Sequence, residues 1–295
     1  MEQAPGRSRG GLQLRAGMPS TRQVDRLGWA PGVVVESFGL RIGLRASTRE
    51  AIVRAAGRLP PGRPGATGRV DLLYSLALGG PGPRPGMRRS HRLYCGDARI
   101  ARSLDLGAVL DTLESHARLL VAARSRRGVF LHAGAVAWRG RALVLPGGSR
   151  SGKTTLVAEL VRAGAAYLSD EFAVIRGRRV VPYPKPLSVR DPHEGDRQRP
   201  VGVSALGGWQ QRRPIPVGLV VLAAFERGAA WRARTLPPGR AILSLLKHAV
   251  PARIAPRETL AALEGLARSA PVVRTKRGDA REAARRILAR MERKA

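Results

Sequence analysis

The sequence contains a single cysteine, Cys95, among its 295 residues. One cysteine cannot form a disulfide within the chain or supply a four-thiolate zinc site, so both are excluded. We interpret Cys95 as a small apolar residue of a strand. Long apolar runs are also missing. The longest, such as 219–225, fall far short of the roughly 18 residues that cross a bilayer, so we expect no membrane-spanning helix.

Lysine is scarce in a chain that is otherwise strongly basic. The formal net charge is +32, yet only five of the 53 Lys and Arg residues are lysines. A basic chain often binds nucleic acid or a membrane surface. Here, however, the arginines are scattered and accompany abundant alanine, glycine and proline, which is typical of a GC-rich genome. The sequence therefore does not favour nucleic acid as a partner, and the charge indicates a general attraction for anions, including nucleotides and acidic peptides.

The N-terminal segment 1–27 is basic and lacks the apolar stretch of a secretory signal. We expect it to be a flexible N-terminus, and we expect the protein to be cytoplasmic. The hydrophobic content of 43% is enough for a buried core. The sequence leaves open whether the chain forms a homo-oligomer.

The patterns in 28–127 predict an α+β accessory domain. Its first helix opens with the spacing of a capping box, from Ser47 to Glu50. The apolar face of that helix is expected to comprise Ala51, Ile52, Val53 and Ala56. The other predicted elements are hairpins around Phe38-Gly39 and Gly96-Asp97, a strand near 70–78 and a helix over 106–123.

The remaining residues, 128–295, predict an α/β domain in which two strands lead into a glycine-rich loop and a helix follows it. Its predicted strands are 129–138, 142–145, 166–168, 172–175, 179–181 and 272–276, with a hairpin formed by 217–225 and 231–235. Its predicted helices are 154–163, 242–248, 258–269 and 280–293.

The glycine loop, 147–154, matches the phosphate-binding pattern G-x-x-x-x-G-K-[ST] between an apolar strand and an amphipathic helix. Backbone N–H groups of such a loop surround phosphate oxygens, and the helix directs its positive dipole end at them. Lys153 is expected to reach the β- and γ-phosphates of ATP, and Thr154 to offer its hydroxyl to Mg²⁺. The predicted nucleotide-binding residues are Gly147, Gly148, Ser149, Arg150, Ser151, Gly152, Lys153, Thr154 and Thr155.

Two acidic residues, Asp170 and Glu171, follow the next predicted strand, where a carboxylate can face Mg²⁺ and the γ-phosphate. Only one helix and one strand separate them from Lys153, whereas motor, transport and switch NTPases usually have a longer segment before their acid. Neither an LSGGQ-like nor an NKxD-like motif is present. The alternative is that the two acids form the solvated end of a strand.

His132 lies on the predicted strand that pairs with the strand before the loop. Taken alone, a histidine in such an apolar run is more often a core residue. The run 132–175 nevertheless resembles the catalytic half of HPr kinase/phosphorylase, in which a histidine followed by glycine precedes the phosphate loop and a hydrophobic-x-Asp-Asp motif follows it. The counterparts here are Leu131-His132-Ala133-Gly134 and Leu168-Ser169-Asp170-Glu171.

This resemblance implies an α/β fold with a P-loop kinase core of the HPr kinase/PEP carboxykinase type after an N-terminal α+β accessory domain, as in HPr-kinase-related proteins found with peptide-modification systems. It implies ATP and Mg²⁺ as cofactors and transfer of phosphate to a serine or other hydroxyl. The implied catalytic residues are His132, Lys153 and Asp170, and the implied metal ligands are Thr154, Asp170 and Glu171. Which carboxylate holds the metal and which acts as a base stays open.

The chain also departs from that family. Its second acid is Glu171 instead of aspartate, and the later Glu-x-x-Gly-rich segment is replaced by the proline-rich strip 182–190. Lys185 and Arg190 of this strip can meet phosphate or an acidic substrate, or the strip can be a rigid surface connection. The polar stretch 190–213 is expected to be a mobile loop that closes over substrate.

Three functions are compatible with these residues. The first is a hydroxyl kinase that phosphorylates a small protein, a peptide or a metabolite. The second is a small-molecule kinase like shikimate or nucleoside kinases, in which His132 has no role. The third is a regulatory protein that binds ATP without transferring its phosphate.

Overall fold

The computed structural model describes residues 13–14, 22–148, 151–190 and 198–293. The predicted loop residues Ser149 and Arg150, and parts of the segments 1–27 and 190–213, therefore lie outside the described residues. The chain divides into two compact units, one ending at Arg126 and the other beginning at Arg127. None of the described helices has the length and apolar content needed to cross a bilayer.

The first unit contains a six-stranded sheet with the strand order β4-β2-β3-β6-β7-β8. The pairs β2–β3 and β7–β8 are antiparallel hairpins, which confirms both predicted turns. β3 and β6 run parallel, so the sheet is mixed. Its strands are β2 (Val33–Ser37), β3 (Leu40–Ala46), β4 (Arg63–Gly65), β6 (Leu72–Ala77), β7 (His91–Cys95) and β8 (Ala98–Ser103).

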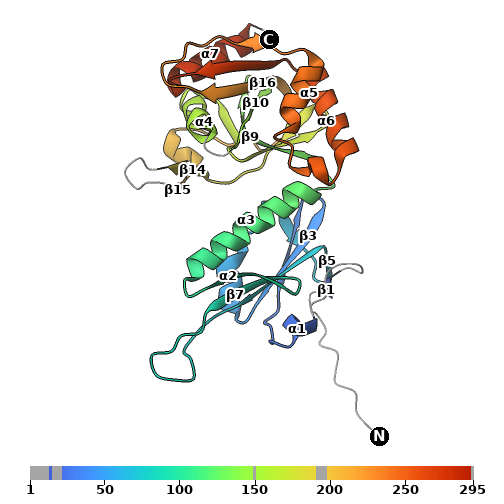
Figure 1. Ribbon diagram of the computed structural model, residues 1–295, viewed down its shortest axis with the longest axis vertical. Coiled ribbons are helices and arrows are strands. Elements are labelled where there is room, and N and C mark those ends of the chain that lie inside the picture. The colour runs from blue at the N-terminus through green and yellow to red at the C-terminus, as the bar shows by residue number, and fades with distance from the viewer. Residues whose placement is uncertain (1–12, 15–21, 149–150, 191–197, 294–295) are drawn as a thin grey trace. The chain divides into compact units, whose positions relative to one another are not determined.

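Two helices, α2 (Arg49–Ala56) and α3 (Leu106–Arg124), accompany this sheet (Figure 1). The helix predicted over 106–123 is confirmed by α3. The start of α2 differs from the predicted capping box by one residue, because Thr48 is the N-cap and accepts a hydrogen bond from the N–H of Ala51. The side chain of Ser47 instead accepts from the N–H of Leu78.

The buried face of α2 also differs from the predicted one. Ala51 and Ile52 are buried as expected, but Val53 is 72% exposed and Ala55 is fully buried. Residues three and four apart share a helix face, so a face built on Ala51, Ile52 and Ala55 turns Val53 toward solvent.

Part of the N-terminal segment 1–27, which was predicted to be flexible, has regular structure. β1 pairs in parallel with β5, and Asp25 at the end of α1 forms a salt bridge with Arg45 of β3. Backbone pairing and this ion pair tie both pieces to the first unit. The elements are β1 (Gln13–Leu14), α1 (Arg22–Asp25) and β5 (Arg69–Val70).

In the second unit five strands close into a ring. β9 pairs with β10 and β12, β12 pairs with β13, β13 pairs with β16, and β16 pairs with β10. The ring closes because the long strands β9 and β16 present different segments to different neighbours. The five strands are β9 (Val129–Trp138), β10 (Arg141–Pro146), β12 (Phe172–Arg176), β13 (Arg179–Val181) and β16 (Ile215–Phe225).

Three further strands extend this sheet. β11 pairs with β9, β18 pairs with β16, and β17 pairs with β18. Most predicted strands are confirmed, but the hairpin predicted from 217–225 and 231–235 is wrong. β16 lies between β10 and β18, so β17 pairs with the outer side of β18. The three strands are β11 (Ala166–Ser169), β17 (Arg234–Thr235) and β18 (Val272–Arg277).

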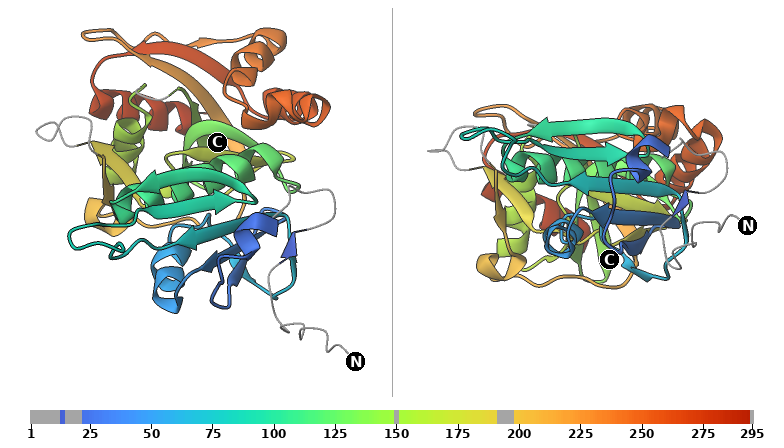
Figure 2. Two further views of the ribbon diagram at one scale, coloured as in Figure 1. Left: turned by 60° about the horizontal axis from the view of Figure 1, so that its bottom comes forward. Right: turned by 90° about the horizontal axis from the view of Figure 1, so that it is seen from below.

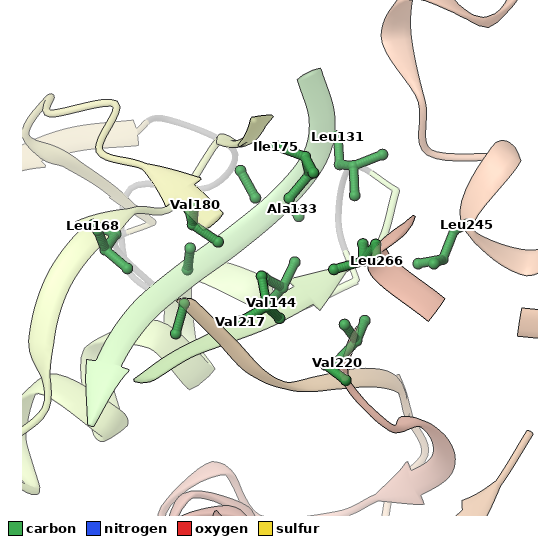
Figure 3. Close-up of a cluster of buried hydrophobic side chains, with 14 of the residues drawn as sticks. Leu131, Ala133, Val144, Leu168, Ile175, Val180, Val217, Val220, Leu245 and Leu266 are labelled. Carbon is green, nitrogen blue, oxygen red and sulfur yellow. The ribbon is translucent and has the colours of Figure 1, made fainter. Parts of the chain in front are cut away.

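Two pairs of helices cover the two faces of the sheet. α4 and α7 pack over one core, which includes Leu143, Val157 and Ile287. α5 and α6 lie side by side (Figures 1 and 2) over the other core, whose side chains include Leu131, Val144 and Leu266 (Figure 3). The helices, each near a predicted one, are α4 (Lys153–Arg162), α5 (Pro238–Leu246), α6 (Pro256–Ser269) and α7 (Ala280–Glu292).

The stretch 190–213 contains regular structure where it is described. β14 (Leu187–Arg190) and β15 (Gln198–Val201) form an antiparallel two-stranded sheet. The 3-10 helix η1 (Val203–Leu206) follows. A strand and a 3-10 helix therefore stand at 198–201 and 203–206 where a loop was predicted, and closure over substrate stays a prediction.

Gly134 allows α4 to approach β9 closely. A Cβ at this position would lie 2.6 Å from Cγ2 of Val157, and Val157 is completely buried. Real Cβ contacts are longer than this, so a larger residue requires the Val157 side chain or the helix that carries it to shift. The glycine after His132 therefore has a packing role that is visible only in three dimensions.

We predict that Gly134→Ala lowers the free energy of unfolding by about 1–3 kcal/mol, because it overpacks the contact with Val157. Urea denaturation measures the change. A matched control is Gly265→Ala in α6, where an added Cβ meets nothing within 4 Å and is expected to stabilise the helix by up to about 1 kcal/mol. Equal effects of the two substitutions would contradict the prediction.

Candidate functional site

Those predicted site residues that the structure describes lie at one edge of the sheet of the second unit. β10, β16 and β18 run parallel to one another, and β11 has the same direction because both it and β10 are antiparallel to β9. In α/β sheets, ligands bind beyond the carboxyl ends of such strands. The glycine loop follows β10 and the two acids follow β11. β16 and β18 also end at this edge, so the segments that follow them begin here.

The glycine loop leads directly into α4. Gly152 is the N-cap of the helix, has a φ of 76° and makes no side-chain capping bond, so the first N–H groups of α4 are left to bind an anion. A Cβ on Gly147 would lie 2.6 Å from the hydroxyl of Ser151. That hydroxyl is buried and has no hydrogen-bond partner among the described residues, which indicates a place for a polar ligand atom.

Lys153 folds back over the loop. Its Nζ donates to the carbonyl oxygens of Gly147 and Gly148, at 2.7 and 2.6 Å. Burial lowers the pKa of Lys153 to about 8, while Asp170 and Glu171 act to raise it. The ammonium therefore lies within the loop, where a phosphate would offer stronger acceptors than the two carbonyls do.

Asp170 is a buried residue, 4% exposed, and its carboxylate contacts three parts of the unit. Its Oδ2 accepts from the hydroxyl of Thr154 at 3.2 Å and from the N–H of Ser188 at 2.9 Å. Its Oδ1 lies 3.0 Å from the hydroxyl of Tyr167 and 3.2 Å from Nζ of Lys185. Loop, strand and proline-rich strip therefore meet on one side chain, and the alternative of a solvated strand end is excluded for Asp170.

The two acids lie in the short break between β11 and β12, two strands that pair one after the other with β9. β11 and β12 both run antiparallel to β9, with Ser169 opposite Ala135 and Phe172 opposite His132. The hydroxyl of Ser169 accepts from the N–H groups of Glu171 and Phe172. Because the serine satisfies these backbone groups, the chain can leave the ladder here and turn the acids toward the loop.

The proline-rich strip 182–190 contributes Lys185 to the site. The Lys185 side chain is 6% exposed, and its Nζ lies 3.6 Å from Oε2 of Glu171 in addition to its contact with Asp170. Of the two alternatives for this strip, the rigid surface connection is wrong at Lys185. The side chain of Arg190 lies outside the described part of the chain.

His132 lies at the same edge, where its backbone joins the loop to α5. Its N–H donates to the carbonyl of His248, just beyond α5, and its carbonyl accepts from the N–H of Gly147. Burial lowers the pKa of His132 to about 4, helped by the charges of Lys153 and His248, whereas Asp170 acts to raise it. His132 is therefore neutral at pH 7, and its ring contacts Phe172 edge to face.

A pocket of about 440 Å³ lies beside the glycine loop. Gly152 and Thr155 form its loop side, and the chain after β16 and β18 forms the other side. Arg277, at the end of β18, donates to the carbonyl of Gly152 at 3.0 Å and stacks over the ring of Phe225. Phe225 is 60% exposed and therefore offers an aromatic face. The remaining lining residues are Arg227, Gly228, Gly278, Asp279 and Ala280.

The oxygen atoms near the loop fit a magnesium ion that arrives with phosphate. The Thr154 hydroxyl and Oδ2 of Asp170 lie 3.2 Å apart, and Mg²⁺ prefers such hard oxygen ligands and completes its shell with phosphate and water. Among the described residues, no group of three or more His, Cys, Asp or Glu side chains is placed to hold a metal by itself.

Sequence reasoning did not identify Tyr167, His248, Phe225 and Arg277 as residues of this edge. Phe225 and Arg277 carried one usable signal, since Phe225 ends a predicted strand, Arg277 directly follows another, and the carboxyl ends of parallel strands meet. Tyr167 and His248 carried none, because their positions depend on the turn after β11 and on the end of α5.

No family model matches the sequence, and no curated protein matches it. Among solved structures, the chain is similar to the HPr(Ser) kinase/phosphatase from Coxiella burnetii, with 13% identity, a TM-score of 0.30, and coverage of 56% of this chain and 95% of that one. A TM-score this low carries no argument about fold or function, so the site is interpreted from its own geometry.

We predict that the depressed pKa of His132 makes the protein less stable in mild acid. Between the native value of about 4 and the unfolded value of about 6.5, the unfolded state binds the extra proton, so stability rises with pH. Lowering the pH from 7.5 to 5.5 should cost about 1 kcal/mol through this partly exposed residue. Urea denaturation of the protein and of His132→Asn, which lacks the titration, at both pH values measures it. An equal pH effect in both proteins would refute the assignment.

Proposed function

We propose that the chain binds ATP with Mg²⁺ and transfers the γ-phosphate to a serine or other hydroxyl group of a small protein, a peptide or a metabolite. The observation that carries this proposal is the contact between Thr154, at the start of α4, and the buried carboxylate of Asp170. This contact places the N-terminus of a helix that can bind phosphate next to a carboxylate that can face a metal ion. Phosphoryl transfer needs both groups at the same place.

The loop and Lys153 supply the phosphate contacts in this proposal. The N–H groups at the start of α4 point at the anion, and Lys153 exchanges its two carbonyl acceptors for phosphate oxygens. The unpartnered hydroxyl of Ser151 is a further donor. Magnesium, when bound, neutralises charge on the β- and γ-phosphates. Thr154 and Oδ2 of Asp170 would hold it.

The pocket beside Gly152 and Thr155 accommodates the nucleoside in this proposal. Its volume of about 440 Å³ falls in the range of small-molecule sites, and the exposed ring of Phe225 can stack on a base. Arg277 fixes the pocket to the loop through the carbonyl of Gly152. The γ-phosphate end of the nucleotide then lies toward Asp170 and His132.

His132 acts as a neutral group in this scheme. With a pKa of about 4, its ring carries no charge near pH 7 and can accept a hydrogen bond from an acceptor hydroxyl or a water molecule. Asp170 already has four donors around its two oxygens, so one must leave before it accepts a proton. Because Oδ2 lies beside the Thr154 hydroxyl, whose proton would turn away when an ion binds, we assign Asp170 to metal binding and alignment, and His132 to the side of the acceptor.

We predict that Lys153→Ala and Asp170→Ala each reduce Mg²⁺-dependent ATP turnover by about 100-fold or more, because each removes charge stabilisation of the transferring phosphoryl group. Calorimetry of ATP binding and phosphate release assays measure the effect. Lys276→Ala is the matched control, since Lys276 is an exposed lysine paired with Glu226. Absence of ATP binding to the unmodified protein would refute the proposal.

His132→Ala distinguishes the two kinase hypotheses. A shikimate- or nucleoside-kinase-like reaction gives this histidine no role, so turnover would stay unchanged in the variant.

The four donors around Asp170 favour, as a second candidate function, a protein that binds ATP without transfer. Binding of labelled ATP with no hydrolysis and no labelled peptide after prolonged incubation would support that function over the kinase.

A further inference from the structure

Lys185 lies between the two acidic side chains of the site. Its Nζ is 3.2 Å from Oδ1 of Asp170 and 3.6 Å from Oε2 of Glu171. The Lys185 side chain is 6% exposed and that of Asp170 is 2% exposed. A buried carboxylate needs a positive partner, and Lys185 is a lysine in a chain that otherwise uses arginine almost throughout.

The position of Lys185 is fixed by several contacts of its neighbours. Its carbonyl lies 3.0 Å from the hydroxyl of Tyr167, and its Nζ donates to the hydroxyl of Ser188 at 2.8 Å. Leu187 is completely buried, and the prolines on either side of Lys185 restrict the backbone. The ammonium is therefore held in place by the fold and is not a surface charge that happens to reach the acids.

The two oxygens of Asp170 face different partners. Oδ2 accepts a hydrogen bond from Thr154 of the glycine loop, while Oδ1 forms an ion pair with Lys185. A metal ion shared by Oδ1 and Glu171 would need the place that the ammonium occupies, and two cations at that distance repel each other. On the other side, Oδ2 accepts from Ser188 and from the Thr154 hydroxyl. An ion bound with phosphate can lie there once the Thr154 proton turns away, and no resident cation occupies that position among the described residues.

We propose that Lys185 is a resident cation that takes the place of a metal ion between Asp170 and Glu171, so that Glu171 is a partner of Lys185 and not a metal ligand. The nucleotide-bound protein then holds one divalent ion, on the Thr154 side of Asp170. This inference rests on the proposed function in assigning that ion to ATP. It makes Lys185 a positioning residue that neutralises the acidic pair.

Titration with Mn²⁺, followed by electron paramagnetic resonance, tests the proposal on the full chain. With one equivalent of a non-hydrolysable ATP analogue, the unmodified protein should bind about one Mn²⁺ per chain. Lys185→Gln removes the ammonium and should bind about two, and it should also gain one ion when the analogue is left out. Lys276→Gln, an exposed lysine in an ion pair, should behave as the unmodified protein does.

Glu171→Gln provides an independent arm that does not rely on the folding of the Lys185 variant, because the Glu171 side chain is 24% exposed. It should leave the single nucleotide-dependent Mn²⁺ bound within about twofold of its original affinity. Adding Glu171→Gln to Lys185→Gln should remove the ion that the single variant gained. Loss of the nucleotide-dependent ion in Glu171→Gln would overturn the proposal.

Other outcomes separate the inference from the proposed function. Two Mn²⁺ ions in the unmodified protein, or a folded Lys185→Gln variant that gains none, would overturn the inference while leaving nucleotide binding intact. If calorimetry shows that the analogue does not bind, the proposed function fails. The titration of Lys185→Gln without nucleotide then still decides whether the ammonium occupies a metal position.

Discussion

The buried carboxylate of Asp170 is the interaction on which the arrangement of the candidate site depends. Thr154 brings the start of α4 to it, Tyr167 brings β11, and Ser188 with Lys185 brings the proline-rich strip. A buried charge with four donors fixes all of them, because losing any partner leaves charge unsatisfied in a region of low dielectric constant. The loop is thereby placed relative to the acids before any ligand is present.

Sequence periodicity predicted most local elements of the second unit because each has a strong pattern of its own. The apolar strands before the loop and the helix after it are present as β10 and α4. Which distant strands pair with one another was harder to predict from the sequence. The hairpin predicted for 217–225 and 231–235 does not form, because β16 already pairs with β10 and β18. A local sequence pattern carries no information about which neighbours a strand already has.

The site was predictable to a similar degree. The spacing of Lys153 and Asp170 predicts both beyond the ends of two strands, and they follow β10 and β11 there. His132 lies inside β9 and reaches this edge because its carbonyl accepts from the N–H of Gly147. Lys185 was recognised as a possible phosphate contact, but its pairing with the acids depends on how the strip folds back against Tyr167. Burial of that kind is a property of the tertiary fold, and the roles that the family resemblance implies remain proposals.

The closed ring of β9, β12, β13, β16 and β10 has a consequence for pairing with strands of other molecules. Each of these strands has a neighbour on both sides, so their backbone groups offer no template to a strand of another molecule. At β17, the last strand of the sheet order, the pairing covers only Arg234 and Thr235, and both are exposed. Short polar ends of this kind discourage edge-to-edge pairing with another chain.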